Sequence, residues 1–265
     1  MNVAFVGKGG IGKTTLAALT IEWAAEHYPD EAILAVDVDP ACTLHYALGL
    51  PEPTTVGDAV EETKSVLNTG RGIPSGMTRG EWLRGALGEL IVPVDTLRDS
   101  VDLLAMGRTE GRGCYCNVNH ILRATVDGII DQYDLVVMDT EAGMEHVSRR
   151  TSDRVDHLFV VAQTNIASLG VAKRILETAD DVELSVGQNH LVLNAVDGAD
   201  DWVEDLLAAK GPSHAVIEDL TVDGEVIQVV RDEGIRKAWM TGDLIGYEGP
   251  AVDALESALG RLIVQ

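Results

Sequence analysis

A glycine- and lysine-rich segment, GKGGIGKTT at residues 7–15, follows directly on an apolar run and opens a stretch with helical spacing. Within it, Gly7, Gly12, Lys13 and Thr14 fit the pattern G-x-x-x-x-G-K-[ST]. Glycines at these positions let successive backbone N–H groups converge on phosphate oxygens, and the positive end of the following helix dipole adds to the attraction. A strand, a tight loop and a helix must therefore follow one another in this part of the chain.

The loop also predicts roles for individual side chains. We expect Lys13 to reach the β- and γ-phosphates of a nucleotide and the Thr14 hydroxyl to ligate Mg²⁺. The expected nucleotide-binding residues of the loop are Gly7, Lys8, Gly9, Gly10, Ile11, Gly12, Lys13, Thr14 and Thr15. A chance glycine-rich turn does not explain the preceding strand, the Lys-Thr pair and the helix together.

Short apolar runs bounded by turn residues recur along the chain, and stretches with helical spacing lie between them. The runs are residues 3–6, 32–36, 101–105, 135–138, 157–162 and 190–193, and the helical stretches are 14–26, 117–131 and 167–180. Continuous apolar runs are typical of parallel strands that are covered on both faces. The alternation predicts an α/β fold, a single doubly wound domain over residues 1–265 whose mostly parallel central sheet is flanked by helices.

Two segments stand apart from this alternation. Residues 51–98 are rich in Pro, Gly, Thr and charge, which predicts an irregular insertion with one short helix near 81–91. Residues 250–264 carry apolar residues on one helical face and predict an amphipathic helix that docks on the fold.

The charge balance argues against two classes of partner. Lys plus Arg total 20 against 43 Asp plus Glu, a formal net charge of −23, and a field of this sign repels nucleic-acid backbones and anionic lipid. No stretch approaches the roughly 18 uninterrupted apolar residues that span a bilayer. We therefore expect a cytoplasmic protein that binds neither nucleic acid nor membrane.

A second lysine, Lys8, stands directly after the first glycine of the loop. The resulting GKGGxGKT resembles the signature of a P-loop ATPase family (the SIMIBI class with a deviant Walker A motif) that includes septum-site MinD, ParA partition ATPases, nitrogenase iron protein, and arsenite and tail-anchored-protein ATPases. The resemblance implies that Lys8 crosses a dimer interface to the partner's phosphates. It also implies ATP as the nucleotide, hydrolysis to ADP and phosphate, and a homodimer that forms on ATP binding.

The segment DVDP at residues 37–40 places two carboxylates at the end of the second apolar run. Ligands of α/β sheets bind at this edge, and a carboxylate there can orient water toward the γ-phosphate. The resemblance implies this role for Asp39. For Asp37, a turn-favouring residue at a strand end remains an alternative.

Two more strand ends carry residues with implied roles. Asp139, in DTEAG at 139–143, stands where such ATPases hold the Mg²⁺ shell through water, and Gly143 stands where the backbone swings toward the γ-phosphate. Asn194 is implied to read the adenine edge, although Ala195 follows it where relatives commonly carry a basic residue. The expected catalytic residues are Lys8, Lys13, Asp39 and Asp139.

Two of the three cysteines, Cys114 and Cys116, are nearly adjacent. One such pair offers two soft ligands, short of the four of a closed tetrahedral site, but a dimer supplies four. Four thiolates on a two-fold axis suit Zn²⁺, Ni²⁺ or an iron–sulfur cluster. Two inert buried thiols, or one helix N-terminal Cys with a lowered pKa, remain the alternative. His120 and His146 are further candidate ligands, with an ordinary surface or core histidine as the alternative for each, and Cys42 is expected to be a packing residue.

The loop, the cysteine pair and the segment DTEAGMEH at 139–146 together resemble the CooC-type accessory ATPases of carbon monoxide dehydrogenase. The resemblance implies ATP-dependent assembly of the four-cysteine site and insertion of nickel into a client metalloenzyme such as carbon monoxide dehydrogenase. Gln163-Thr164, where relatives tend to have Glu-Pro, is a departure near the base or the dimer contact.

Two other functions stay open. A MinD- or ParA-like positioning ATPase would need a basic tail or a DNA-binding surface, and the sequence shows neither. A reductase like nitrogenase iron protein would hold an iron–sulfur cluster on the dimer axis. That family takes its cysteines from distant segments, whereas here they are two residues apart.

Overall fold

The computed structural model describes residues 1–97, 100–108, 116–141, 154–181, 185–196, 220 and 222–263. Within these ranges eight strands form one sheet, in the order β3-β4-β2-β5-β1-β6-β7-β8. The strands are β1 (Asn2–Gly7), β2 (Ile33–Asp37), β3 (Val92–Pro93), β4 (Val101–Ala105), β5 (Leu135–Asp139), β6 (Arg154–Ala162), β7 (Ser185–Val196) and β8 (Val226–Val230). All neighbours pair in parallel except β3, which is antiparallel to β4. The predicted α/β fold with a mostly parallel sheet is confirmed.

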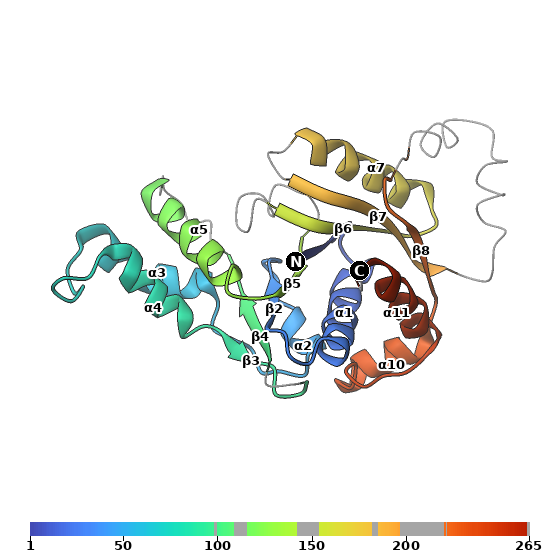
Figure 1. The fold of residues 1–265 in the computed structure, drawn as a ribbon, viewed down its shortest axis with the longest axis horizontal. Helices are drawn as coiled ribbons and strands as arrows, with labels where there is room; N and C mark the ends of the chain where they lie inside the picture. Colours follow the sequence, from blue (N-terminus) through green and yellow to red (C-terminus); the bar gives the residue numbers. More distant parts are fainter. Residues whose placement is uncertain are drawn as a thin grey trace.

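Helices cover both faces of the sheet (Figure 1). They are α1 (Lys13–His27), α2 (Leu44–Ala47), α3 (Val56–Thr69), α4 (Arg79–Gly88), α5 (Cys116–Ile130), α7 (Ile166–Asp181), α10 (Glu233–Thr241) and α11 (Pro250–Leu262). Successive strand residues point to opposite faces, so Phe5 packs in a core with α1, α2, α10 and α11, and Val6 in a second core with α5 and α7. None of the helices in the described ranges is both long and apolar enough to cross a bilayer.

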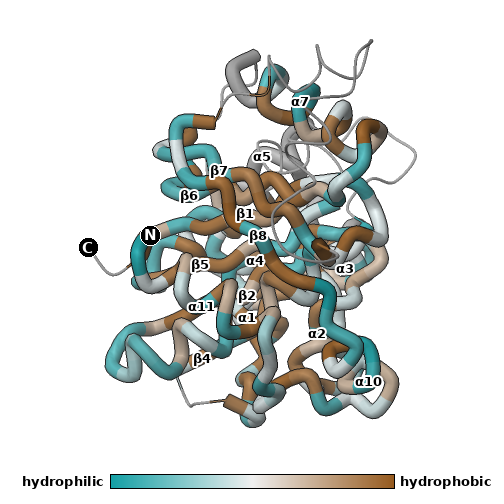
Figure 2. Tube along the Cα trace, turned by 90° about the vertical axis from the view of Figure 1, so that its right-hand side faces the viewer, coloured by the Kyte–Doolittle hydropathy of each residue, from teal (hydrophilic) through white to brown (hydrophobic). Residues whose placement is uncertain are grey.

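Two edge strands were absent from the sequence prediction. Central strands such as β2 and β5 are buried throughout and read as unbroken apolar runs (Figure 2). By contrast, β8 alternates between exposed and buried residues and carries Gln228 at its centre, while β3 is two residues long and contains Pro93. A half-covered edge strand gives no continuous apolar signal, because one of its faces meets solvent.

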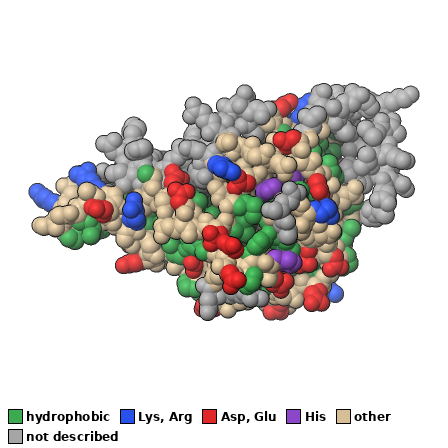
Figure 3. Space-filling view, viewed as in Figure 1, with side chains coloured by type: hydrophobic (Ala, Val, Ile, Leu, Met, Phe, Trp, Pro, Cys, Tyr) green, Lys and Arg blue, Asp and Glu red, His purple; other side chains and the backbone are tan. Residues whose placement is uncertain are grey.

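The prediction of an irregular insertion at 51–98 was wrong over its first half. The segment holds two helices, α3 and α4, each opened by a capping box: Thr55 Oγ1 accepts from the Asp58 N–H at 3.1 Å, and Thr78 Oγ1 from the Glu81 N–H at 3.2 Å. These boxes fix helix starts in a stretch whose composition reads as loop. The helix predicted near 81–91 corresponds to α4. Lys and Arg side chains gather at the outer end of the segment that holds α3 and α4, at the left of Figure 3.

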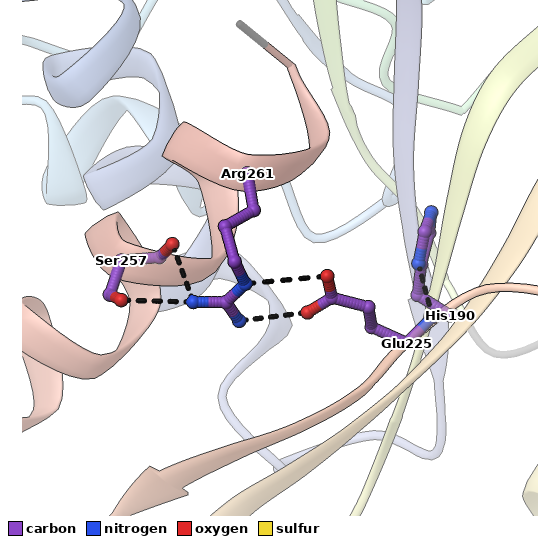
Figure 4. A network of polar contacts seen from close by, with 4 residues as sticks. All are labelled: His190, Glu225, Ser257 and Arg261. Carbon is purple, nitrogen blue, oxygen red and sulfur yellow. Dashed lines mark hydrogen bonds and ion pairs between the residues drawn. The ribbon is translucent and has the colours of Figure 1, made fainter. Parts of the chain in front are cut away.

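The C-terminal helix α11 docks on the sheet as predicted, with Val252, Leu255 and Leu259 buried. Its Arg261 forms a two-pronged ion pair with Glu225 ahead of β8, Nη2 to Oε2 at 2.8 Å and Nε to Oε1 at 3.3 Å (Figure 4). Arg261 Nη1 also donates to the carbonyl of Ser257 at 2.9 Å. The helix is thereby tied to the last strand by polar contacts as well as by its apolar face.

The ion pair continues into a pair of histidines, buried His190 and half-buried His157. The backbone N–H of Glu225 donates to His190 Nδ1 at 3.0 Å, and His190 Nε2 lies 3.1 Å from His157 Nδ1. Burial lowers the pKa of His190 to about 4. A neutral His190 that accepts at Nδ1 carries its proton on Nε2, so it donates to His157.

Candidate functional site

The carboxyl ends of the central strands bring together the polar residues that the sequence singled out. Strand register pairs Asp37 with Asp139 and Gly7 with Val161. Helix α1 begins at the same edge with Lys13. Because parallel strands all end at one edge, residues more than a hundred positions apart in sequence meet there, at the place where α/β sheets bind ligands.

The loop between β1 and α1 requires glycine at both of its ends. Gly7 has φ 147° and Gly12 has φ 95°, values that favour glycine. A Cβ on Gly7 would overlap the carbonyl oxygen of Val161, and a Cβ on Gly12 would overlap the side-chain amide of Asn194. The loop therefore lies close against the ends of β6 and β7. Both its backbone conformation and its packing require glycine at positions 7 and 12.

The two lysines of the loop have different environments. Lys13 is 6% exposed and its Nζ donates to the carbonyl of Lys8 at 3.3 Å, whereas the Lys8 side chain is exposed. Desolvation lowers the pKa of Lys13, and the carboxylates of Asp139, Asp39 and Glu141 act to raise it. A buried ammonium with carboxylates around it sits within the loop, and the second lysine faces solvent.

A short hydrogen bond joins Thr14 to Asp139. Thr14 Oγ1 donates to Asp139 Oδ2 at 2.6 Å and lies 3.5 Å from Thr43 Oγ1. Burial raises the pKa of Asp139 to about 6, while Thr14 and Lys13 lower it. Asp139 Oδ1 is buried with no hydrogen-bond partner among the described residues. An unpaired carboxylate oxygen beside a hydroxyl fits the hard oxygen ligands that Mg²⁺ takes in nucleotide sites.

The neighbouring carboxylates Asp37 and Asp39 make different contacts. Asp37 accepts the N–H groups of Leu44 at 2.9 Å and Asp39 at 3.2 Å, and burial raises its pKa to about 7. Asp39 is half-exposed and accepts the N–H of Ala41 at 2.8 Å. Asp37 thus shapes the backbone turn after β2, a role the sequence had left open, and Asp39 lies near enough to Lys13 to act on its pKa.

A cavity of about 340 Å³ opens beside the phosphate loop. Gln163 and Asn194 line one side. Its lining also includes a stretch that sequence reasoning missed, made up of Val229, Val230, Arg231, Asp232, Glu233, Ile235 and Arg236. It went unrecognised because β8 was not predicted. The signal that could have found it is Asp232, whose Oδ1 accepts the N–H of Gly234 at 2.8 Å and caps α10.

Comparison with known proteins identifies the family. An uncharacterised ATP-binding protein of Methanocaldococcus jannaschii is 41% identical over 196 residues, which cover 74% of this chain and 75% of that protein. The chain belongs to the MinD/ParA/CooC-type family of P-loop ATPases. No family model matches it.

Two further proteins are similar to this chain, one in sequence and one in fold. The carbon monoxide dehydrogenase accessory protein CooC of Rhodospirillum rubrum is 29% identical over 196 residues, 69% of this chain and 70% of that protein. The MinD cell division protein of Aquifex aeolicus shares the fold with a TM-score of 0.64 at 20% identity, covering 100% of this chain and 98% of that chain.

Some residues predicted for a CooC-type P-loop ATPase lie outside the described ranges: Cys114, Gly143 and His146. Cys116 is the first residue of α5 and His120 lies one turn further, but the structure describes neither side chain. In the described part of the chain, no group of three or more His, Cys, Asp or Glu residues could hold a metal ion.

Cys42, the third cysteine of this P-loop ATPase, is half-buried beside the turn after β2. Its Sγ donates to the carbonyl of Asp39 at 3.5 Å, and burial raises its pKa to about 11. A protonated thiol packed in this way is a poor nucleophile and a poor metal ligand.

Proposed function

We propose that this ATPase is an ATP-driven dimer switch that binds nickel or zinc between subunits through Cys114 and Cys116 and inserts nickel into a client metalloenzyme such as carbon monoxide dehydrogenase. The observation that carries the proposal is the pairing of Thr14 with Asp139 beside buried Lys13, because it supplies the parts of a nucleotide switch at one sheet edge.

Each residue of this edge has a place in the proposed switch. Lys13 neutralises the β- and γ-phosphates, and Thr14 with Asp139 holds Mg²⁺, which offsets charge on the phosphate oxygens when bound. Asp39 orients the attacking water. Lys8 reaches across the dimer to the partner's nucleotide, which its exposed position allows.

The position of α5 supports a link between this edge and the cysteines. Strand β4 ends at the same edge, since Ala105 pairs with Asp37, and the chain continues from there to α5. The other end of α5 lies at the opposite edge, where Ile130 lines a shallow cleft with Met1 and Asn2. Helix α5 therefore starts on the nucleotide side, and Cys116 is its first residue.

A conformational change at the nucleotide site would therefore take place at the same sheet edge at which α5 begins. Release of phosphate would relax the segment that follows Asp139, in which Gly143 is the proposed hinge. Separation of the subunits would then halve the four-thiolate site and free the metal for the client. The name of the R. rubrum relative, an accessory protein of carbon monoxide dehydrogenase, supports this client class.

The test is metal content as a function of nucleotide. Two samples are purified under anaerobic conditions: the wild type with ATP, and the slowly hydrolysing Asp39→Ala variant. Each should bind one Ni²⁺ or Zn²⁺ per dimer. Elemental mass spectrometry measures the metal content, and sedimentation measures the oligomeric state. Cys114→Ser with Cys116→Ser should abolish metal binding and leave ATP affinity unchanged. Cys42→Ser, which removes the one cysteine outside the pair, is the control and should keep the metal.

The alternatives give different results in the same experiment. Iron and sulfide with visible absorption would favour a reductase resembling nitrogenase iron protein. A dimer that forms with ATP and binds no metal would favour a positioning ATPase. Metal that survives the double serine change would refute the inter-subunit cysteine site.

A further inference from the structure

Two hydrogen bonds fix the side chain of Asn194 at the end of β7. Its Oδ1 accepts the backbone N–H of Ala195 at 2.9 Å, and its Nδ2 donates to the carbonyl oxygen of Ile11 at 2.6 Å. A flipped amide would turn its oxygen toward the Ile11 carbonyl, so the partners determine its orientation. Asn194 therefore joins the end of the sheet to the middle of the phosphate loop.

The backbone next to Asn194 is strained. Ala195 has φ 57°, a region that carries an energetic cost for a residue with a Cβ. The pairing of β7 with β8 also shifts register between Asn194 and Val196. Bulges re-aim side chains, and strained backbone persists where its surroundings require it. Here the side chain that is re-aimed is Asn194.

The phosphate loop is held from two sides at this point. Ile11 is 4% exposed and packs in the core beneath α1. Its carbonyl is held by Asn194, and a Cβ on Gly12 would overlap the Asn194 amide nitrogen. The peptide group between Ile11 and Gly12 is thus held in two ways. The Ile11 side chain is packed in the core, and the Ile11 carbonyl accepts a hydrogen bond from Asn194.

This contact sets the direction of one phosphate-binding group. In a planar trans peptide, the carbonyl of Ile11 and the N–H of Gly12 point in opposite directions. Since the carbonyl points to Asn194, the N–H points away from β7, and phosphate loops bind their ligand through such N–H groups. We propose that Asn194 is a positioning residue that holds the phosphate loop in its triphosphate-binding orientation, a role that deepens nucleotide binding at this loop and goes beyond contact with the base.

The two roles of Asn194 are separable. After the two hydrogen bonds, its amide retains one N–H and one lone pair, which is enough for a contact in the cavity that it also lines. A residue that only reads the base affects ATP and leaves an inorganic triphosphate untouched. A residue that holds the loop affects ATP, GTP and tripolyphosphate alike.

The experiment measures the affinities of ATP, GTP and tripolyphosphate with Mg²⁺ by titration calorimetry for the wild type and Asn194→Ala. Removal of one buried hydrogen bond from the loop should weaken all three by a common factor of about ten. Exchange of the backbone amides of residues 8–13 with deuterium should accelerate in the nucleotide-free variant. Thermal unfolding verifies that the variant folds; if it does not, Asn194→Ser removes the same donor.

The matched control is Gln163→Ala, which alters the same cavity wall and should change the ratio of ATP to GTP affinity while leaving tripolyphosphate alone. The proposal is overturned if Asn194→Ala weakens ATP and spares tripolyphosphate, or if all three affinities stay within twofold of the wild type. A wild-type protein that binds none of the three would instead contradict nucleotide binding itself, which separates the two failures.

Discussion

The Thr14 hydroxyl donates to the Asp139 carboxylate at 2.6 Å, although 125 positions separate the two residues. The remaining Asp139 oxygen is buried without a hydrogen-bond partner in the described part of the chain. A carboxylate held in this way is costly in the nucleotide-free protein and useful once a cation is bound. This balance leads to the first prediction.

Asp139→Asn should remove the dependence of ATP affinity on Mg²⁺. The amide is neutral and a weaker ligand, so affinity with Mg²⁺ should fall about 10- to 100-fold toward the value measured with EDTA. The nucleotide-free variant should be more stable at pH 8 by about 1–3 kcal/mol, because it no longer buries a charge whose pKa is raised. Calorimetry and thermal unfolding measure both effects. Asp131→Asn, a substitution of an exposed carboxylate, is the control. An unaltered Mg²⁺ dependence of ATP affinity in Asp139→Asn would count against Asp139 as part of the Mg²⁺ site.

Asp39→Ala should separate ATP binding from ATP hydrolysis. If Asp39 orients the attacking water, hydrolysis should slow by about 10²- to 10⁴-fold, while ATP affinity remains within about threefold because Lys13 and the loop backbone are unchanged. The variant should therefore accumulate as the ATP-bound dimer. Phosphate release and sedimentation velocity measure the two properties. Normal turnover in Asp39→Ala would refute the water-orienting role.

The contribution of Asp37 and Asp139 to the stability of the nucleotide-free protein should fall as pH rises from 5 to 8. Burial raises the pKa of Asp37 to about 7 and of Asp139 to about 6, so the folded protein holds protons that the unfolded chain releases near pH 4. Their stabilising contribution is present at low pH and is lost as pH rises through these values. Thermal unfolding over this range measures the slope, and Asp37→Asn should flatten it. A pH slope that Asp37→Asn leaves unchanged would contradict the assignment.

The paired histidines His157 and His190 should give an opposite effect on stability on the acid side. Burial lowers the pKa of His190 to about 4, and that of His157 is lowered as well. The unfolded chain binds these protons more readily, so their contribution is present above about pH 6.5 and is lost as pH falls toward 4. The two effects together predict maximal stability at mildly acidic pH.

Arg261→Ala and His190→Ala should differ in cost although both disrupt one network. The Arg261 and Glu225 side chains are 54% and 36% exposed, and such ion pairs contribute about 1 kcal/mol or less. His190 is fully buried and its ring stacks on Phe159 at 4.9 Å, so its loss should cost about 2–4 kcal/mol. Urea unfolding at pH 7.5 measures both. An equal loss of unfolding free energy in the two variants would contradict the small contribution expected of the exposed Arg261–Glu225 pair.

The sequence predicted the elements whose signals are local. The phosphate loop combines a glycine pattern with a strand before it and a helix after it, and the central strands are buried on both faces, so their runs are unbroken. Helix α3 and strand β8 were missed because one is encoded by its capping box and the other is half exposed. In both cases composition alone gave the wrong signal.

The sequence by itself determined that the loop at residues 7–15 follows a strand and opens a helix, since the glycines and the Lys-Thr pair are contiguous. Only the tertiary structure decided that Asp37 shapes a turn, that Asp139 lies against Thr14, and that Asn194 holds Ile11. These contacts depend on strand register and on a bulge, which bring distant residues to one edge. A hydrogen bond across the sheet has no signature in sequence spacing, because the distance between its partners is set by the packing of the strands that carry them.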